Sequence, residues 1–211
     1  MFSFINIIDI IGTVAFAISG IRLASAKKFD WFGAYVVGLI TAVGGGTLRD
    51  ICLGATPFWM TQPSYIIWTG FSLLYVIFFG KLLIKQNNTF FTFDTIGLAL
   101  FVVVGIEKTL AYGFPMWVAI IMGTFTGAAG GIMRDILINE IPLVFRKDVY
   151  AMACVFGGLV YYFGLLLGLE ETLTQCLSAA GTIGIRIIAV KYHISIPAFK
   201  GEEEGDNLEK S

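Results

Sequence analysis

The sequence repeats itself at a fixed offset, without a gap. The segment GGTLRDI at 45–51 returns as GGIMRDI at 130–136. The two copies are 85 residues apart, and we call this spacing the repeat offset. A gapless comparison of residues 9–65 with residues 94–150 gives 18 identities in 57 positions. Internal similarity of this kind inside an apolar chain is typical of transport proteins that are built from repeats. We therefore expect a pathway for a solute or an ion.

The composition indicates an integral membrane protein. The chain is 57% hydrophobic and only 14% charged, whereas a typical soluble domain is about 25% charged. Long apolar runs recur along the chain, and a membrane-spanning helix needs about 20 residues of this kind. These runs are continuous rather than alternating, which excludes a membrane β-barrel. Seven of them are expected to be helices, at about 4–22, 32–54, 64–85, 93–112, 116–139, 149–168 and 172–191.

The predicted fold is all-α, with seven transmembrane helices arranged as two inverted three-helix repeats plus a seventh helix. Each repeat contains an odd number of spans, so the second copy must enter the membrane in the opposite direction. The repeats cover about residues 4–85 and 90–168, and the seventh helix covers about 172–191. One transmembrane domain over 1–199 is therefore expected, followed by a disordered acidic tail at 200–211.

The distribution of Lys and Arg predicts the orientation. Cytoplasmic loops of membrane proteins carry an excess of these residues. With the N-terminus outside and the C-terminus in the cytoplasm, only Lys108 falls on the outer side. The cytoplasmic side then receives Arg22, Lys27, Lys28, Lys81, Lys85, Arg146, Lys147, Lys191 and Lys200. We expect a multi-pass protein of the inner (plasma) membrane.

The second helix of each repeat carries small residues at every fourth position, which allow another backbone to approach closely. Each also carries a row of three small residues, which weakens the helix. A kink at such a row would free backbone groups to line water. Tight packing is the simpler alternative. The six positions are Gly44, Gly45, Gly46, Ala129, Gly130 and Gly131.

An Arg-Asp pair follows each glycine row and lies about one helical turn inside the membrane boundary. These pairs are Arg49 with Asp50 and Arg134 with Asp135. Ionisable residues at this depth usually face a bundle interior or an aqueous cavity. Helix anchoring with outward snorkelling is the alternative, but two symmetric copies favour a functional pathway.

Equal depth in the membrane predicts the partners of these charges. Asp9 begins the first span on the side where the second span ends with Arg49. Asp94 has the same relation to Arg134 in the second repeat. We therefore expect the ion pairs Asp9–Arg49 and Asp94–Arg134, one at each mouth of the pathway.

The seventh helix presents a polar stripe with a spacing of four residues, formed by Thr174, Ser178, Thr182 and Arg186. Such a stripe shares one helix face. It either walls an aqueous path, with Arg186 holding Asp135, or its hydroxyls bond the carbonyl groups one turn earlier while Arg186 snorkels.

No enzyme is expected, because the chain contains no Ser-His-Asp, HExxH, P-loop or paired-cysteine arrangement. Neither a cofactor nor a bound metal is predicted. No basic stripe suggests a nucleic-acid partner. The expected partners are membrane lipids, further copies of the chain and permeant monovalent cations.

The motifs GGGTLRD and AGGIMRD, set in inverted three-span repeats with a seventh helix, resemble the trimeric intracellular cation channel family. The resemblance is to its bacterial and archaeal members and covers residues 5–195. It implies a homotrimer with one pore in each protomer, bounded by the second and fifth spans. It also implies conduction of K⁺ with Na⁺ permeability. The Lys-Glu-Val element that animal members use for phosphoinositide binding is absent here.

Two functions remain open on these grounds. One is a passive cation channel, and the other is a secondary transporter of a small solute such as glycine, because inverted repeats and broken helices fit both. Since the polar residues converge within one repeat pair, we expect three separate pores around an apolar three-fold axis that lipid can fill.

Overall fold

The computed structural model describes residues 4–85, 89–146 and 149–194, and within these ranges every regular element is helical. The acidic tail at 200–211 and Lys147 lie outside the described residues. The elements are α1 (Phe4–Ala26), α2 (Trp31–Cys52), α3 (Phe58–Thr61), α4 (Ser64–Lys85), α5 (Thr89–Ala111), α6 (Met116–Leu137), η1 (Leu143–Phe145), α7 (Ala151–Leu166) and α8 (Glu171–Lys191). The all-α class is confirmed.

Each of the seven predicted spans coincides with a helix, although the spans are unequal. Within the described residues, five helices are long and apolar enough to cross a membrane: α1, α2, α5, α6 and α8. The remaining two, α4 and α7, contain shorter apolar stretches at Ser64–Gly80 and Ala151–Leu166. The sequence did not predict the short helices α3 and η1, which follow α2 and α6.

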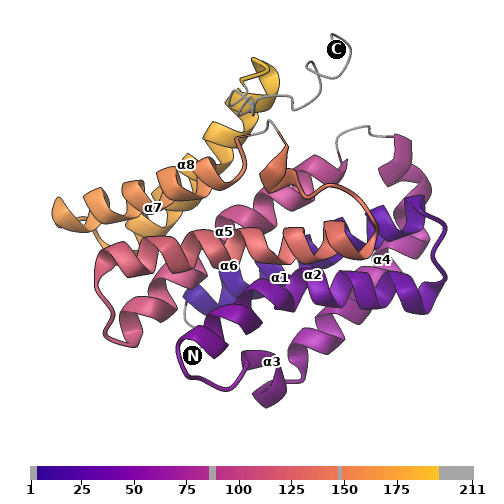
Figure 1. The fold of residues 1–211 in the computed structure, drawn as a ribbon, viewed down its shortest axis with the longest axis horizontal. Coiled ribbons are helices and arrows are strands. Elements are labelled where there is room, and N and C mark those ends of the chain that lie inside the picture. Colours follow the sequence, from indigo (N-terminus) through magenta and orange to yellow (C-terminus); the bar gives the residue numbers. More distant parts are fainter. Residues whose placement is uncertain (1–3, 86–88, 147–148, 195–211) are drawn as a thin grey trace, which may run out of the picture.

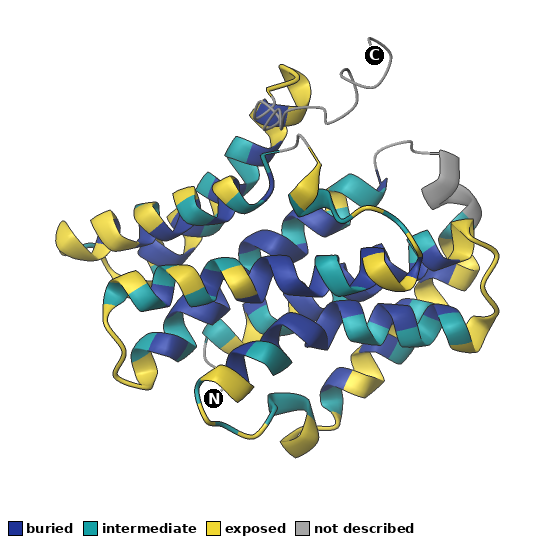
Figure 2. Ribbon diagram, in the orientation of Figure 1, coloured by how far each residue is buried: buried dark blue, intermediate teal, exposed yellow. Residues whose placement is uncertain are grey.

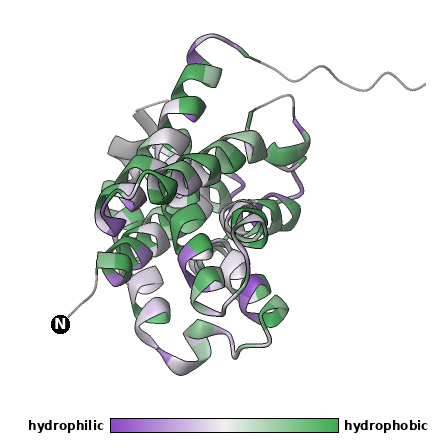
Figure 3. Cartoon of the chain, turned by 90° about the vertical axis from the view of Figure 1, so that its left-hand side faces the viewer, coloured by the Kyte–Doolittle hydropathy of each residue, from purple (hydrophilic) through white to green (hydrophobic). Residues whose placement is uncertain are grey.

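The helices α1, α2, α5 and α6 form the centre of the molecule (Figure 1). The other helices lie around them: α4 packs against α1 and α2, and the α7–α8 pair packs against α5 and α6. Buried residues concentrate on the central helices (Figure 2). Large apolar side chains such as Phe32, Phe78 and Trp117 point outward, and strongly hydrophobic colours run along the helices in Figure 3. Such a surface suits contact with lipid.

The helices α2 and α6 cross in close contact at their glycines. A Cβ atom on Gly45 would overlap the backbone carbonyl oxygen of Thr126. A Cβ atom on Gly130 would overlap the carbonyl oxygen of Thr41. These two contacts are related by the repeat offset, so the same contact is made twice. Glycine is required at both positions because only a bare backbone allows this approach.

A second reciprocal contact joins α1 to α5. Gly12 lies against the Phe101 ring, and Gly97 lies against the Phe16 ring. The two rings meet edge to face with their centroids 5.2 Å apart. This pair again follows the repeat offset. The internal repeat is thus visible in the packing as well as in the sequence.

The glycine rows do not interrupt their helices. The predicted kink stays a prediction, but both α2 and α6 are helical through all six positions. The helix–helix crossing explains why: each row lies buried against a neighbouring helix, and this packing stabilises the helical backbone. The two helices end at Cys52 and Leu137, two residues before the predicted ends. Gly54 (φ +70°) and Asn139 (φ +57°) follow in the left-handed conformation that commonly terminates a helix.

The variant Gly45→Ala should destabilise the fold, because its methyl group would meet a backbone carbonyl that cannot rotate away. Overpacking of this kind costs about 1–3 kcal/mol. Gly70→Ala on α4 is the matched control, because a Cβ atom there meets nothing within 4 Å. Thermal melting in detergent, followed by tryptophan fluorescence, measures both. Equal melting temperatures would show that the crossing is not closely packed.

Candidate functional site

Two cavities lie at opposite ends of the central bundle. The first, which we call the Asp9 cavity, measures about 340 Å³ and lies between the starts of α1 and α4 and the ends of α2 and α5. The second, the Asp135 cavity, measures about 360 Å³ and lies between the ends of α1 and α6 and the start of α5. Opposite ends of α1 and α5 therefore contribute to the two cavities.

The cavities are counterparts under the internal repeat. Four wall positions of the Asp9 cavity have partners, at the repeat offset, in the wall of the Asp135 cavity. The pairs are Ile5 with Phe90, Lys108 with Leu23, Ala111 with Ala26, and Phe58 with Leu143. The Lys108–Leu23 pair breaks the likeness, because it places a charge in one cavity and an apolar group in the other.

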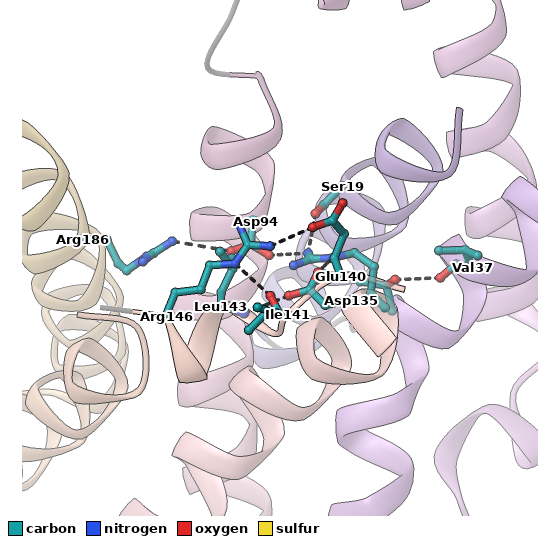
Figure 4. Close-up of polar contacts among 11 residues, drawn as sticks. Ser19, Val37, Asp94, Asp135, Glu140, Ile141, Leu143, Arg146 and Arg186 are labelled. Carbon is teal, nitrogen blue, oxygen red and sulfur yellow. Dashed lines mark hydrogen bonds and ion pairs between the residues drawn. The ribbon is translucent and has the colours of Figure 1, made fainter. Parts of the chain in front are cut away.

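The predicted ion pair Asp94–Arg134 is confirmed. Arg134 Nη1 lies 2.5 Å from Asp94 Oδ1 and also donates to Ser19 Oγ at 2.8 Å. Its Nε donates to Asp135 Oδ1 at 2.9 Å, and its guanidinium group lies 4.7 Å from the Phe90 ring centroid. The Arg134 and Asp94 side chains are fully buried. Figure 4 shows Ser19, Asp94 and Asp135 lying close together.

One sequence-based alternative placed Arg186 against Asp135, but the structure shows a different partner. Arg186 Nη2 lies 3.7 Å from Asp94 Oδ2 instead, so Asp94 lies between two guanidinium groups (Figure 4). The Arg186 guanidinium group also stacks over the rings of Phe91 and Tyr150 at 5.0 and 4.8 Å. Arg134 therefore binds both Asp94 and Asp135, and Arg186 adds a second cation at Asp94.

The predicted pair Asp9–Arg49 is also wrong, because no ion pair joins these two residues within the part of the chain that the structure describes. Arg49 binds the neighbouring Asp50, with Nε and Nη2 both 2.8 Å from Oδ1. Lys108 Nζ approaches the same oxygen at 2.9 Å. Asp9 instead accepts a hydrogen bond from the Tyr65 hydroxyl group at 2.5 Å. Asp9 and Arg49 do line the same cavity.

The two motif aspartates have a structural role that sequence reasoning missed. Asp50 Oδ2 accepts from the backbone N–H of Phe58 at 2.9 Å. Asp135 Oδ2 accepts from the backbone N–H of Leu143 at 3.0 Å. Each aspartate therefore fixes the start of the short helix, α3 or η1, that returns over the end of its own long helix. The equal spacing of the donor and acceptor in both repeats could have revealed this contact.

The polar stripe of α8 packs against α7. Ser178 Oγ donates to the Gly157 carbonyl oxygen at 2.8 Å, and Thr182 Oγ1 donates to the Ser178 carbonyl oxygen at 3.1 Å. Thr174 packs against Gly164, and all three hydroxyl-bearing residues are buried. None of them lines either cavity, and the Thr182 hydroxyl group bonds the carbonyl group one turn earlier, as the second of the two alternatives predicts.

Glu107 is a membrane-depth carboxylate that sequence reasoning missed. It lines the Asp9 cavity and accepts hydrogen bonds from the Tyr161 hydroxyl group and from Gln175 Nε2, the latter at 2.6 Å. These contacts tie α5 to α7 and α8. No repeat signal marks this residue, because its counterpart in the first repeat is Arg22.

An exposed ion-pair cluster joins the α1–α2 connection to the segment after α6. Lys27 Nζ lies 2.5 Å from Glu140 Oε1. Arg146 Nη2 lies 3.3 Å from Glu140 Oε2 (Figure 4). The hydrogen bond and charge of Lys27, with a smaller effect of Arg146, lower the pKa of Glu140. This contribution to stability is therefore complete above the ordinary pKa of glutamate and is lost as the pH falls through the lowered value.

The variant Asp94→Asn should be strongly destabilised, because it leaves Arg134 and Arg186 buried without their shared counter-charge. Breaking a buried pair in this way costs about 3–5 kcal/mol. Asp9→Asn is the control: an asparagine oxygen can still accept from Tyr65, so the loss should be about 1 kcal/mol. Thermal melting of both purified variants measures the difference. A smaller effect of Asp94→Asn than of Asp9→Asn would contradict the assigned role of Asp94.

The sequence is similar to a known membrane-protein family. A family described as Glycine transporter matches residues 6–81 and 91–165, two segments whose starts are related by the repeat offset. The chain is 40% identical over 203 residues to a UPF0126 membrane protein of Vibrio cholerae, which covers 93% of this chain and 83% of the relative. It is 36% identical over 207 residues to the UPF0126 inner membrane protein YadS of Escherichia coli, which covers 94% and 97%.

The similarity extends to a solved channel structure. An orthologue of the trimeric intracellular cation channel from Rhodobacter sphaeroides aligns with a TM-score of 0.85 and 31% identity. The alignment covers 90% of this chain and 98% of that chain. The chain therefore belongs to the membrane-protein family described as Glycine transporter and UPF0126, and it is a prokaryotic member of the trimeric intracellular cation channel family.

Proposed function

We propose that this protein is a passive channel for monovalent cations, conducting K⁺ with Na⁺ permeability. The observation that carries the proposal is the pair of cavities at opposite ends of one protomer, with the glycine crossing of α2 and α6 within the same central bundle. A path from one cavity to the other along this crossing would span the bundle. The similarity of this protein to the Rhodobacter sphaeroides channel orthologue supports the same function.

The charge of the Asp9 cavity favours cations. Its wall carries two carboxylates, Asp9 and Glu107, and two cationic groups, Arg49 and Lys108. Both cationic groups are bound to Asp50, which adds a third negative charge. Carboxylates at a channel mouth attract cations. Selectivity between K⁺ and Na⁺ should be modest, because the chain contains no carbonyl-lined TVGYG segment.

The permeation path proposed here depends on an inverted-repeat architecture. The reciprocal contacts Gly45–Thr126 and Gly130–Thr41 support a two-fold relation between α1–α4 and α5–α7. We place the N-terminus outside and the C-terminus in the cytoplasm of the inner membrane, from the Lys and Arg distribution. In this orientation the Asp9 cavity opens outward and the Asp135 cavity opens to the cytoplasm. A bend of α2 and α6 at their glycines would widen the path during opening.

We further propose a homotrimer with one pore in each protomer. Both cavities and both charged clusters lie within a single chain. A three-fold axis would repeat one face of the chain, and the exposed faces are largely apolar. Such an axis suits packing against further copies or filling by lipid.

Purified protein in planar bilayers tests the channel function. We expect unitary currents whose reversal potential follows the K⁺ and Na⁺ gradients and does not follow the Cl⁻ gradient. A transporter that works by alternating access moves solute too slowly to produce resolvable unitary currents. The competing function, secondary transport of a solute such as glycine, predicts saturable uptake into liposomes without unitary currents. That result would overturn the proposal.

The number of pores can be counted with linked trimers. Gly131→Leu should obstruct conduction, because Gly131 already lies against the Tyr150 hydroxyl group and the Arg134 guanidinium group. With three independent pores, one mutant subunit in a linked trimer should leave about two thirds of the current. Linked trimers carrying Gly70→Ala in one subunit control for the linkage. Complete loss of current from one Gly131→Leu subunit would indicate a single shared pore.

A further inference from the structure

The Phe58 ring fills the space beside the third glycine of the first motif. A Cβ atom on Gly46 would overlap Phe58 Cε1 and would lie 3.2 Å from Cζ. The ring is therefore pressed against the bare backbone of α2, one residue beyond the crossing at Gly45. Phe58 also lines the Asp9 cavity. Its ring thus stands between this cavity and the glycine segment of α2.

Charged and aromatic groups hold the ring in this place. The Arg49 guanidinium carbon and Lys108 Nζ lie 5.6 and 5.8 Å from the ring centroid. Cations at this distance are attracted to the face of an aromatic ring. The Tyr65 ring meets it edge to face, with centroids 4.4 Å apart and an interplanar angle of 85°. The backbone N–H of Phe58 is bound to Asp50, so one charge cluster fixes both the ring and its backbone.

The opposite end of the bundle is built differently. There the space beside Gly131 is taken by the Tyr150 hydroxyl group, and Tyr150 is only 1% exposed beneath the Arg186 guanidinium group. Phe58 is half-buried, on the four-residue helix α3, and it faces an open cavity. A ring in this setting can leave its position by rotation, whereas Tyr150 is enclosed on every side.

We propose that Phe58 is a movable plug of the permeation path. In the present conformation the ring closes the passage between the Asp9 cavity and the glycine crossing. Rotation of the ring into the cavity opens this passage. Glycine is needed at position 46 because any side chain there would displace the Phe58 ring. The inference rests on the proposed channel function, and its failure can be distinguished from the failure of that function.

Single-channel recording of Phe58→Ala in planar bilayers tests the plug. Removing a half-buried aromatic ring shifts the balance between closed and open states by about tenfold, so the open probability should rise by that factor at a fixed voltage. Phe58→Tyr should stay near the wild type, because it retains the ring. Leu143→Ala is the matched control, since Leu143 is the repeat counterpart of Phe58 and lines the other cavity.

A double variant tests the contact itself. Gly46→Ala should raise the open probability by displacing the Phe58 ring. In Gly46→Ala with Phe58→Ala the ring is already absent, so the double variant should match Phe58→Ala alone. Such non-additivity is the signature of two residues that act through one contact. Effects that multiply would show that the two positions act separately and would overturn the inference.

The outcomes separate the two proposals. Wild-type currents with an unchanged or lowered open probability in Phe58→Ala would overturn the plug and leave the channel intact. Saturable uptake without any wild-type current would overturn the channel function. Size-exclusion chromatography verifies assembly of every variant. If Phe58→Ala does not assemble, Phe58→Leu decides in its place, because leucine keeps an apolar contact and still vacates part of the space at Gly46.

Discussion

The contact between α2 and α6 at Gly45 and Gly130 is the constraint on which the rest of the structure depends. Lipid supplies no hydrophobic driving force between helices, so they associate through close packing of small residues. Here the backbone of each helix touches a carbonyl group of the other, and a single methyl group would separate them. Arg49 and Arg134 follow these glycines after about one helical turn. The crossing therefore delivers one charged cluster to each side of itself, and each cavity forms beside one cluster.

The buried charges are stable because each central carboxylate has two cationic partners. Asp50 binds Arg49 and Lys108, and Asp94 lies between Arg134 and Arg186. A lone buried charge would cost several kcal/mol, so shared partners are a physical requirement at this depth. The second cation comes from α5 in one cluster and from α8 in the other. The seventh span, α8, thus supplies the second cation of the Asp94 cluster, whereas a helix of the repeats, α5, supplies that of the Asp50 cluster. This gives α8 a role although it has no repeat counterpart.

The sequence predicted the helices and the pair Asp94–Arg134, because repeat spacing and membrane depth determine both. Equal membrane depth did not predict the partner of Arg49 correctly, because a guanidinium group can reach several acceptors within one turn and Asp50 is adjacent in the chain. The same ambiguity misplaced Arg186. Periodicity grouped Thr174, Ser178 and Thr182 on one face, but it could not tell whether that face meets water or α7. Glu107 escaped notice because no repeated residue marks it. The glycines were recognised, yet their visible role is a close crossing within unbroken helices.

Two identical repeats would give two identical mouths, so the differences between the repeats decide how each end behaves. At the Asp9 cavity the repeat positions carry Lys108 and Phe58, whereas at the Asp135 cavity they carry Leu23 and Leu143. A cation and an aromatic ring attract each other in a way that depends on distance and charge. Two leucines interact only by packing, which is indifferent to charge. A displacement of Lys108 therefore acts on the Phe58 ring, while Leu23 and Leu143 at the opposite end have no equivalent coupling. Substitution at these two positions therefore makes the two cavity mouths chemically different, although both are built on the same repeated helices.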